Sequence, residues 1–140
     1  MHRRPFGRAR RLAAAAALVL LVGSLLPWWT VGGADGLPPV SGNAFEASGI
    51  LVFLAALATL ALVTLPFASE RPIALDRWPV YIVVMGLAVV GFVLRVGSLI
   101  VEGPIASLRP DRAPGLYVVA IGLAGLARAA FEINQEPEPR

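Results

Sequence analysis

The chain has 140 residues, of which 57% are hydrophobic and 15% are charged, with a mean hydropathy of +0.74 and a formal net charge of +3. Soluble domains are about 45–50% apolar and about 25% charged, so this composition excludes an ordinary soluble domain, and it also excludes a disordered chain. Cysteine is absent and the single histidine, His2, lies at the terminus, which excludes disulfides, thiolate or histidine metal sites and histidine-based triads. The composition therefore predicts an integral membrane protein.

Four stretches are long and apolar enough to cross a bilayer as helices. A helix needs about 20 mostly apolar residues to cross roughly 30 Å of hydrocarbon. The third stretch is interrupted by Arg95, and the fourth carries Arg128 and Glu132 in its last turns, four residues apart, where they can pair on one face. The predicted spans are Leu12–Trp29, Gly49–Phe67, Val80–Val101 and Leu116–Ile133.

The segments between the spans are short and rich in residues that break helices. Residues 30–45 contain four glycines and two adjacent prolines, and residues 68–79 and 102–115 combine proline with mixed charge, so all three are predicted to be loops. Backbone groups inside a bilayer must be satisfied within each span, which favours helices, and short connections make sequential helices antiparallel neighbours. The predicted fold class is an all-α membrane protein, an antiparallel four-transmembrane-helix bundle over residues 12–133, with tails at 1–11 and 134–140.

The distribution of arginine predicts how the bundle is oriented. All 12 basic residues are arginines, and nine of them lie in the two tails, in the 68–79 loop or at the end of the fourth span. An excess of arginine marks the cytoplasmic side, so both termini are expected in the cytoplasm and the protein in the inner (plasma) membrane. Aromatic rings are expected at the headgroup level, Trp28, Trp29 and Tyr117 on the outer side and Trp78, Tyr81 and Phe131 on the inner side.

The basic N-terminal tail permits other interpretations. Arg3-Arg4 before an alanine-rich run resembles a twin-arginine or secretory signal, but no small-x-small cleavage site follows and three further spans come after it. An uncleaved first span is therefore favoured. The tail can attract anionic lipid as a side effect of its topological role, and nucleic acid is not predicted as a partner.

Arg95 is the most informative single residue, because an unrelieved charge inside a span costs about 2–3 kcal/mol. Gly91, Arg95, Ser98 and Glu102 share one helical face. The favoured interpretation is an arginine that reaches outward to an acid, and the alternative is a site for an ion or anionic ligand. Antiparallel threading makes Glu46 the expected partner of Arg95, with Glu102, about 10 Å away along the axis, as its rival. The candidate polar or ligand site thus comprises Arg95, Glu46, Ser98 and Glu102.

Neither catalysis nor a cofactor is predicted. The first three spans contain no Asp or Glu that could couple transport to protons at the membrane centre, and the glycines of residues 30–45 lack the spacing and the lysine of a phosphate cradle. The remaining polar residues form no recognisable catalytic set, so catalytic residues, metal ligands and cofactors are all expected to be absent.

Several short motifs are familiar in combination: an arginine-rich start, Leu26-Pro27-Trp28-Trp29 after an alanine-leucine run, a glycine-rich loop, Asn43-Ala44-Phe45-Glu46-Ala47 before the second span and an arginine late in the third. This pattern, which covers nearly the whole chain, resembles small uncharacterised four-helix integral membrane proteins of actinobacteria and other high-GC bacteria. In those proteins an acidic, proline-rich stretch follows the arginine, and Glu102-Gly103-Pro104 is a looser version of it. The resemblance implies a four-helix topology and leaves the activity open.

Two functions remain open at this point. Small residues spaced four apart, such as Ala55 and Thr59, favour close helix packing and hence a non-catalytic accessory or packing subunit of an envelope assembly, either a homo-oligomer or part of a membrane complex. The alternative is a small carrier or sensor that binds an anionic solute or a lipid headgroup on the outer half, near Arg95. In both cases the lipid bilayer is an expected partner.

Overall fold

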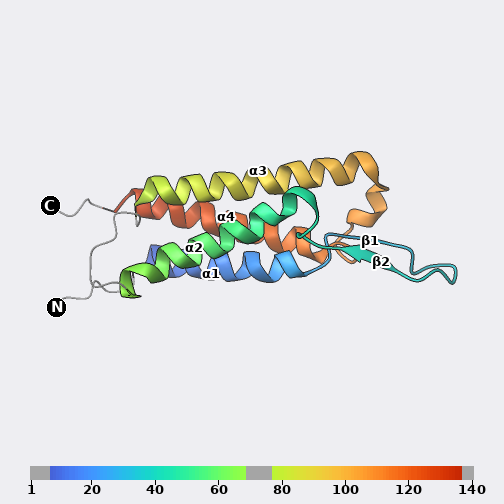
Figure 1. The fold of residues 1–140 in the computed structure, drawn as a ribbon, viewed down its shortest axis with the longest axis horizontal. Helices are drawn as coiled ribbons and strands as arrows, with labels where there is room; N and C mark the ends of the chain where they lie inside the picture. Colours follow the sequence, from blue (N-terminus) through green and yellow to red (C-terminus); the bar gives the residue numbers. More distant parts are fainter. Residues whose placement is uncertain (1–6, 69–76, 137–140) are drawn as a thin grey trace.

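The computed structural model of the chain describes residues 7–68 and 77–136, and it is mostly helical. Four helices lie along one another, with α1 beginning and α4 ending at the same end of the bundle and a small hairpin projecting from the opposite end (Figure 1). The long helices are α1 (Arg8–Leu25), α2 (Ile50–Ala68), α3 (Trp78–Glu102) and α4 (Pro114–Asn134). The short elements are the strands β1 (Trp29–Val31) and β2 (Val40–Gly42) and the 3-10 helices η1 (Ala47–Gly49) and η2 (Ile105–Leu108).

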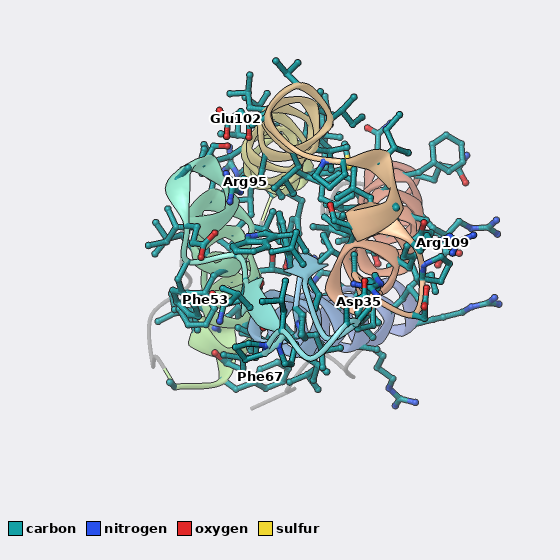
Figure 2. The ribbon with its side chains drawn as sticks, turned by 90° about the vertical axis from the view of Figure 1, so that its right-hand side faces the viewer. Asp35, Phe53, Phe67, Arg95, Glu102 and Arg109 are labelled. Atoms are coloured by element: carbon teal, nitrogen blue, oxygen red, sulfur yellow. The ribbon has the colours of Figure 1, made fainter. Side chains whose placement is uncertain are left out.

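Each helix packs against the next one in the sequence, and α4 packs back against α1. Seen along the bundle axis, the four helices occupy the corners of a square (Figure 2). Alanine dominates the core, which lets the helices approach closely, and Ala55 and Thr59 both face it from α2.

The most extensive helix contact is between α1 and α4, where glycines make room for the neighbouring helix. A Cβ atom on Gly23 would lie 2.7 Å from Cγ2 of Val119, and one on Gly115 would lie 2.7 Å from the carbonyl oxygen of Leu26. A Cβ atom on Gly122 would lie 2.8 Å from Cδ2 of Leu20. Such distances would be shorter than normal van der Waals contacts, so the α1–α4 contact requires glycine at these positions.

Three of the helical segments are long and apolar enough to cross a membrane: Ala47–Ala68, Trp78–Glu102 and Pro114–Asn134. The helix α1 differs because it begins at Arg8 and carries three arginines in its first turn. Its uncharged part covers about 14 residues, or roughly 21 Å, which is less than the hydrocarbon thickness. The predicted span Leu12–Trp29 extends too far at its end, since Leu26, which precedes a proline, is already extended with a ψ of 156°.

The segment 30–45, predicted as an irregular loop, lies largely within a β-hairpin, so the fold is not purely helical. Its strands are antiparallel and pair Trp29 with Gly42, Thr30 with Ser41 and Val31 with Val40. Three residues per strand are too few to leave an alternating pattern in the sequence, which is why the prediction missed them. The connection between the strands has positive φ angles at Gly32, Gly33, Asp35 and Gly36.

Hydrogen bonds hold the hairpin against the bundle. The backbone N–H of Trp28 donates to the carbonyl of Gly42 at 2.7 Å, and the N–H of Ala44 donates to the carbonyl of Ser24 at 3.2 Å. On the other side, the Thr30 hydroxyl donates to the carbonyl of Arg112 at 2.7 Å, and the Arg112 guanidinium donates to the carbonyl of Gly32 at 3.0 Å. The hairpin is therefore an integral part of this end of the molecule.

Two of the aromatic residues expected at the membrane surface lie inside the protein. Trp28 is fully buried, donates from Nε1 to the carbonyl of Gly23 at 2.9 Å and meets the ring of Phe92 edge to face. Tyr81 is also fully buried. Neither ring can contact lipid headgroups, whereas Trp78, Tyr117 and Phe131 are exposed.

Four of the nine arginines that predict the orientation are not among the described residues. Arg3, Arg4, Arg71 and Arg140, which contribute to the arginine count, lie outside the described residues. Among the described charges at the end where α1 begins, Arg10 pairs with Glu136 at 2.7 Å, and Arg128 pairs with Glu132 at 3.0 Å, as their spacing predicts.

Candidate functional site

The centre of the candidate site is an ion pair between Arg95 of α3 and Glu46. The Nη2 atom of Arg95 lies 2.8 Å from Oε2 of Glu46, so the pairing predicted from antiparallel threading is present. Figure 2 shows Arg95 between α3 and α2 at the hairpin end of the bundle. The two side chains differ in environment, because that of Arg95 is 9% exposed and that of Glu46 is 44% exposed.

The close packing of α3 against the start of α2 brings these two residues together. Gly91 lies one turn before Arg95, and a Cβ atom there would fall 2.6 Å from Cβ of Leu51 and 2.8 Å from the carbonyl oxygen of Ser48. A glycine at this position therefore lets α3 approach the beginning of α2. That approach places Arg95 within reach of a residue that immediately precedes η1.

The chain before η1 is shaped by two local features. Oδ1 of Asn43 accepts a hydrogen bond from the N–H of Phe45 at 3.1 Å, and the N–H of Glu46 donates to the carbonyl of Asn43 at 3.3 Å, which folds the segment into a tight turn. Ala47 follows with a φ of 50°, a left-handed conformation that is unfavourable for a residue other than glycine. The turn and the left-handed residue together direct Glu46 toward α3 and the hairpin.

Trp29 of the hairpin also donates a hydrogen bond to Glu46. Its Nε1 donates to Oε2 of Glu46 at 2.9 Å, so one carboxylate oxygen receives hydrogen bonds from both Trp29 and Arg95. Gly42, the strand partner of Trp29, lies directly beneath this carboxylate, and a Cβ atom there would fall 2.5 Å from Cδ of Glu46. The carboxylate thus occupies space that any other residue at position 42 would fill.

Of the two remaining residues of the predicted site, Ser98 contacts Arg95 and Glu102 does not. The Ser98 hydroxyl accepts a hydrogen bond from Nη1 of Arg95 at 3.3 Å and donates to the carbonyl of Arg95 at 2.9 Å. Glu102 is exposed and forms no hydrogen bond or ion pair with any described residue, so it is not the partner of Arg95. The Nε of Arg95 is buried and has no hydrogen-bond partner in the described part of the chain.

An open surface cavity lies beside Glu46. Its volume is about 210 Å³, and it is lined by Leu25, Pro27, Ser41, Gly42, Asn43 and Glu46. Arg95 is not part of its wall. The cavity is therefore formed by the end of α1, the second strand and the turn that follows it.

Sequence reasoning missed the roles of Trp29 and Gly42. Trp29 was expected to face lipid headgroups, whereas its indole N–H is committed to Glu46. The 12 residues between Trp29 and Gly42 do not identify the two as strand partners, because the register depends on the conformation of the intervening glycine-rich connection. A polar indole next to a proline corner is a signal that could have pointed to such a hydrogen bond.

Comparisons of the chain with protein-family models, with curated proteins and with solved structures found no match. Within residues 7–68 and 77–136, no group of three or more His, Cys, Asp or Glu side chains could hold a metal ion. The chemistry available at the site is therefore that of one carboxylate, one guanidinium, an indole N–H and neighbouring hydroxyl and amide groups.

Proposed function

We propose that the protein is a multi-pass inner-membrane protein and a non-catalytic accessory or packing subunit of an envelope assembly. In this proposal all four long helices cross the bilayer, α1 with its arginines at the cytoplasmic surface, and the hairpin faces outward. Arginine side chains at the end of a short span can extend to the headgroups, and the bilayer can thin around such a span. An apolar segment of about 21 Å is therefore long enough to cross.

The observation that carries the proposal is the outer face of α3, defined here by six small or β-branched residues. These residues are separated alternately by three and four positions, a seven-residue repeat typical of helices that pack on a partner helix. Within the described chain, Cβ atoms on its two glycines would meet nothing within 4 Å. The outer face of α3 consists of Val83, Gly86, Val90, Val93, Gly97 and Ile100.

The outer face of α3 fits a helix of another subunit. Its four β-branched residues are each 50% exposed or more, and α3 has the smallest buried share of the three span candidates, 28% against 39% for α4. Because lipid tails are as apolar as these side chains, helices associate in a bilayer through close packing at small residues. Gly86 and Gly97 supply that closeness on a face that no described element covers.

Cysteine cross-linking tests this proposal, since the chain has no native cysteine. We expect Val93→Cys in native membranes to give a discrete cross-linked species, either a disulfide-linked dimer or, with a bifunctional reagent, a complex of defined mass. Leu18→Cys is the matched control, because Leu18 is 54% exposed on α1 and lies outside the α3 face. Identical products from both positions, or a strictly monomeric particle on native purification, would contradict the proposal.

The proposed orientation has a separate test. An impermeant thiol reagent applied to intact cells should label Ser41→Cys in the hairpin and leave Ser69→Cys unlabelled. Ser41 is exposed, and Ser69 lies outside the described residues. The reverse pattern would place the hairpin in the cytoplasm.

The second candidate, a carrier or sensor for an anionic solute or headgroup at Arg95, is favoured by the buried Nε that has no described partner. It is weakened by the contacts of the terminal nitrogens with Glu46 and Ser98, because an anion would have to displace a carboxylate to reach them. A thermal-shift screen with anions, run on the native protein and on Arg95→Ala, distinguishes this candidate from the subunit proposal.

A further inference from the structure

We propose that the cavity beside Glu46 binds a primary ammonium group, a ligand opposite in charge to the anion expected from Arg95 alone. The proposal rests on the cavity and its wall, and it does not depend on a partner for α3. It assigns to the hairpin end of the bundle a binding site for a small amine or for the amine of a lipid headgroup.

The first observation concerns the unused polar groups of the wall. Both hydrogen bonds to the Glu46 carboxylate go to Oε2, which leaves Oε1 without a described donor. The Ser41 hydroxyl likewise has no hydrogen-bond partner among residues 7–68 and 77–136, and Oδ1 of Asn43 accepts one bond, from Phe45. The residues that line the cavity therefore carry a carboxylate oxygen, a hydroxyl oxygen and an amide oxygen that can still accept hydrogen bonds.

The second observation concerns charge. Glu46 carries the only formal charge among the residues that line the cavity. The guanidinium of Arg95 contacts the opposite oxygen of the same carboxylate, and its side chain is 91% shielded from solvent, because 9% is exposed. The residues that line the cavity therefore carry one negative charge and no positive charge, and Arg95 lies outside its wall.

The chemistry of the wall selects an ammonium group over a metal ion. A primary ammonium has three N–H donors and no acceptor, which matches three acceptor oxygens. Calcium requires six to eight oxygen ligands, and a single carboxylate with two neutral oxygens falls well short of that number. A volume of about 210 Å³ holds an aminoethyl group together with a few water molecules.

The position of Gly42 supports a carboxylate held ready for a ligand. Because Gly42 has no side chain, the Glu46 carboxylate rests against the strand, and the wall of the cavity forms around it. Trp29 and Arg95 fix the orientation of the carboxylate from the other side. Arg95 also offsets much of its charge, so we expect weak binding, with a Kd of about 1 mM.

The test uses ethylamine as the probe and purified full-length protein in detergent. Trp29 donates directly to Glu46, so its fluorescence should respond when an ammonium group binds the carboxylate. Thermal stabilisation by the ligand gives an independent readout that does not depend on the indole. We expect saturable binding of ethylamine, and at least tenfold weaker binding of tetramethylammonium, which carries the same charge but has no N–H donor.

Three variants localise the site. We expect Glu46→Gln to weaken ethylamine binding at least tenfold and Ser41→Ala to weaken it about threefold, while Glu102→Gln leaves it unchanged. The last is the matched control, since Glu102 is an exposed carboxylate at the same end of the bundle. Ser41 lies outside the ion pair, so Ser41→Ala tests the cavity even where Glu46→Gln disturbs the fold.

Equal binding of ethylamine and tetramethylammonium, or unchanged binding in both Glu46→Gln and Ser41→Ala, would overturn the proposal. Nanodiscs then identify the source of the ammonium. If phosphatidylethanolamine in a phosphatidylcholine disc raises the apparent Kd of ethylamine, the site binds a lipid headgroup. If the apparent Kd is the same in both discs, the site binds a free amine.

Discussion

The contact between α1 and α4 and the contact between α2 and α3 are built in different ways. The α1–α4 contact is largely apolar and depends on Gly23, Gly115 and Gly122, where an added Cβ atom would lie closer to a neighbouring atom than van der Waals packing allows. The α2–α3 contact has one comparable glycine, Gly91, and adds the charged cluster around Arg95 and Glu46.

The difference shows that an apolar contact and a polar contact contribute differently to the stability and to the arrangement of the helices. Close backbone packing gains dispersion energy over many atoms, so it contributes to stability. A buried ion pair gains little net free energy because both groups lose water. It favours the one arrangement of the helices in which the two charges meet over arrangements in which they do not. Disrupting the close packing at a glycine should therefore lower the free energy of unfolding more than removing the ion pair.

The largest expected effect is at Gly115, in the first turn of α4. A methyl group at this position would lie 2.7 Å and 2.8 Å from the carbonyl oxygens of Leu26 and Gly23, and backbone atoms cannot move aside as a side chain can. We expect Gly115→Ala to lower the free energy of unfolding by about 3 kcal/mol. Thermal or denaturant unfolding in detergent measures this.

Gly97→Ala, measured on the monomer in detergent, is the control for that substitution, because a Cβ atom there meets nothing of the same chain within 4 Å. Alanine in an exposed helix interior is more favourable than glycine by about 0.5–1 kcal/mol, so the control should be neutral or stabilising. A similar loss at both positions would mean that the contacts of residue 115 with the carbonyl oxygens of Leu26 and Gly23 are not the cause of the loss.

The next largest effect separates the two members of the ion pair. Glu46→Gln leaves a guanidinium that is nearly all buried without a counter-charge, and we expect it to cost about 2 kcal/mol. Arg95→Gln leaves a carboxylate that is 44% exposed and can be hydrated, so we expect a loss of about 1 kcal/mol. Unfolding of both single variants in the same detergent compares the two values.

The double variant tests whether the two charges interact directly. It should lose less than the sum of the single losses, because each single variant includes the cost of an unpaired charge that the double variant no longer has. Strict additivity would exclude a direct pair and would make lipid or a ligand the partner of Arg95.

A smaller effect of opposite sign is expected at Ala47. Its φ of 50° costs an alanine about 1–2 kcal/mol relative to a right-handed conformation, and glycine avoids this cost while losing more entropy on folding. We expect Ala47→Gly to stabilise the protein by about 0.5–1 kcal/mol in the same unfolding assay. A loss of stability would show that residue 47 does not adopt the left-handed conformation in the membrane.

The smallest effect is expected at the pair on the surface of α4. Arg128 and Glu132 are four residues apart, and the Arg128 side chain is 67% exposed, so solvent screens most of their attraction. Arg128→Gln should change the free energy of unfolding by less than about 0.5 kcal/mol. A larger loss would indicate that this arginine contacts something beyond the described chain, such as an anionic lipid.

The sequence predicted the features that depend on hydrophobicity and on charge. The apolar stretches of α2, α3 and α4 correspond to helices within a few residues, because a long apolar run leaves few alternatives to a helix. The pairing of Glu46 with Arg95 followed from antiparallel threading, since two costly charges at one level favour contact.

What the sequence could not predict depends on backbone geometry at single residues. The first helix ends at Leu25 because Leu26 precedes a proline, and the chain then returns through a hairpin whose register depends on four left-handed residues. Trp28 looked like a membrane-surface residue by its position, yet it is fully buried, and Gly115 leaves the space that its ring occupies. Local sequence patterns do not show how much space surrounds a side chain in the folded protein.

The ion pair has a consequence for the rotational setting of α3. Gly91, Arg95 and Leu99 lie on its buried side, and at 100° per residue the outer face of α3 is centred about half a turn away from them. Fixing Arg95 against Glu46 therefore also fixes the direction in which Val93 and Gly97 point away from the bundle. Without the pair, a roll of α3 by one residue would turn that surface through about 100° and present a different set of side chains to the lipid and to any neighbouring helix.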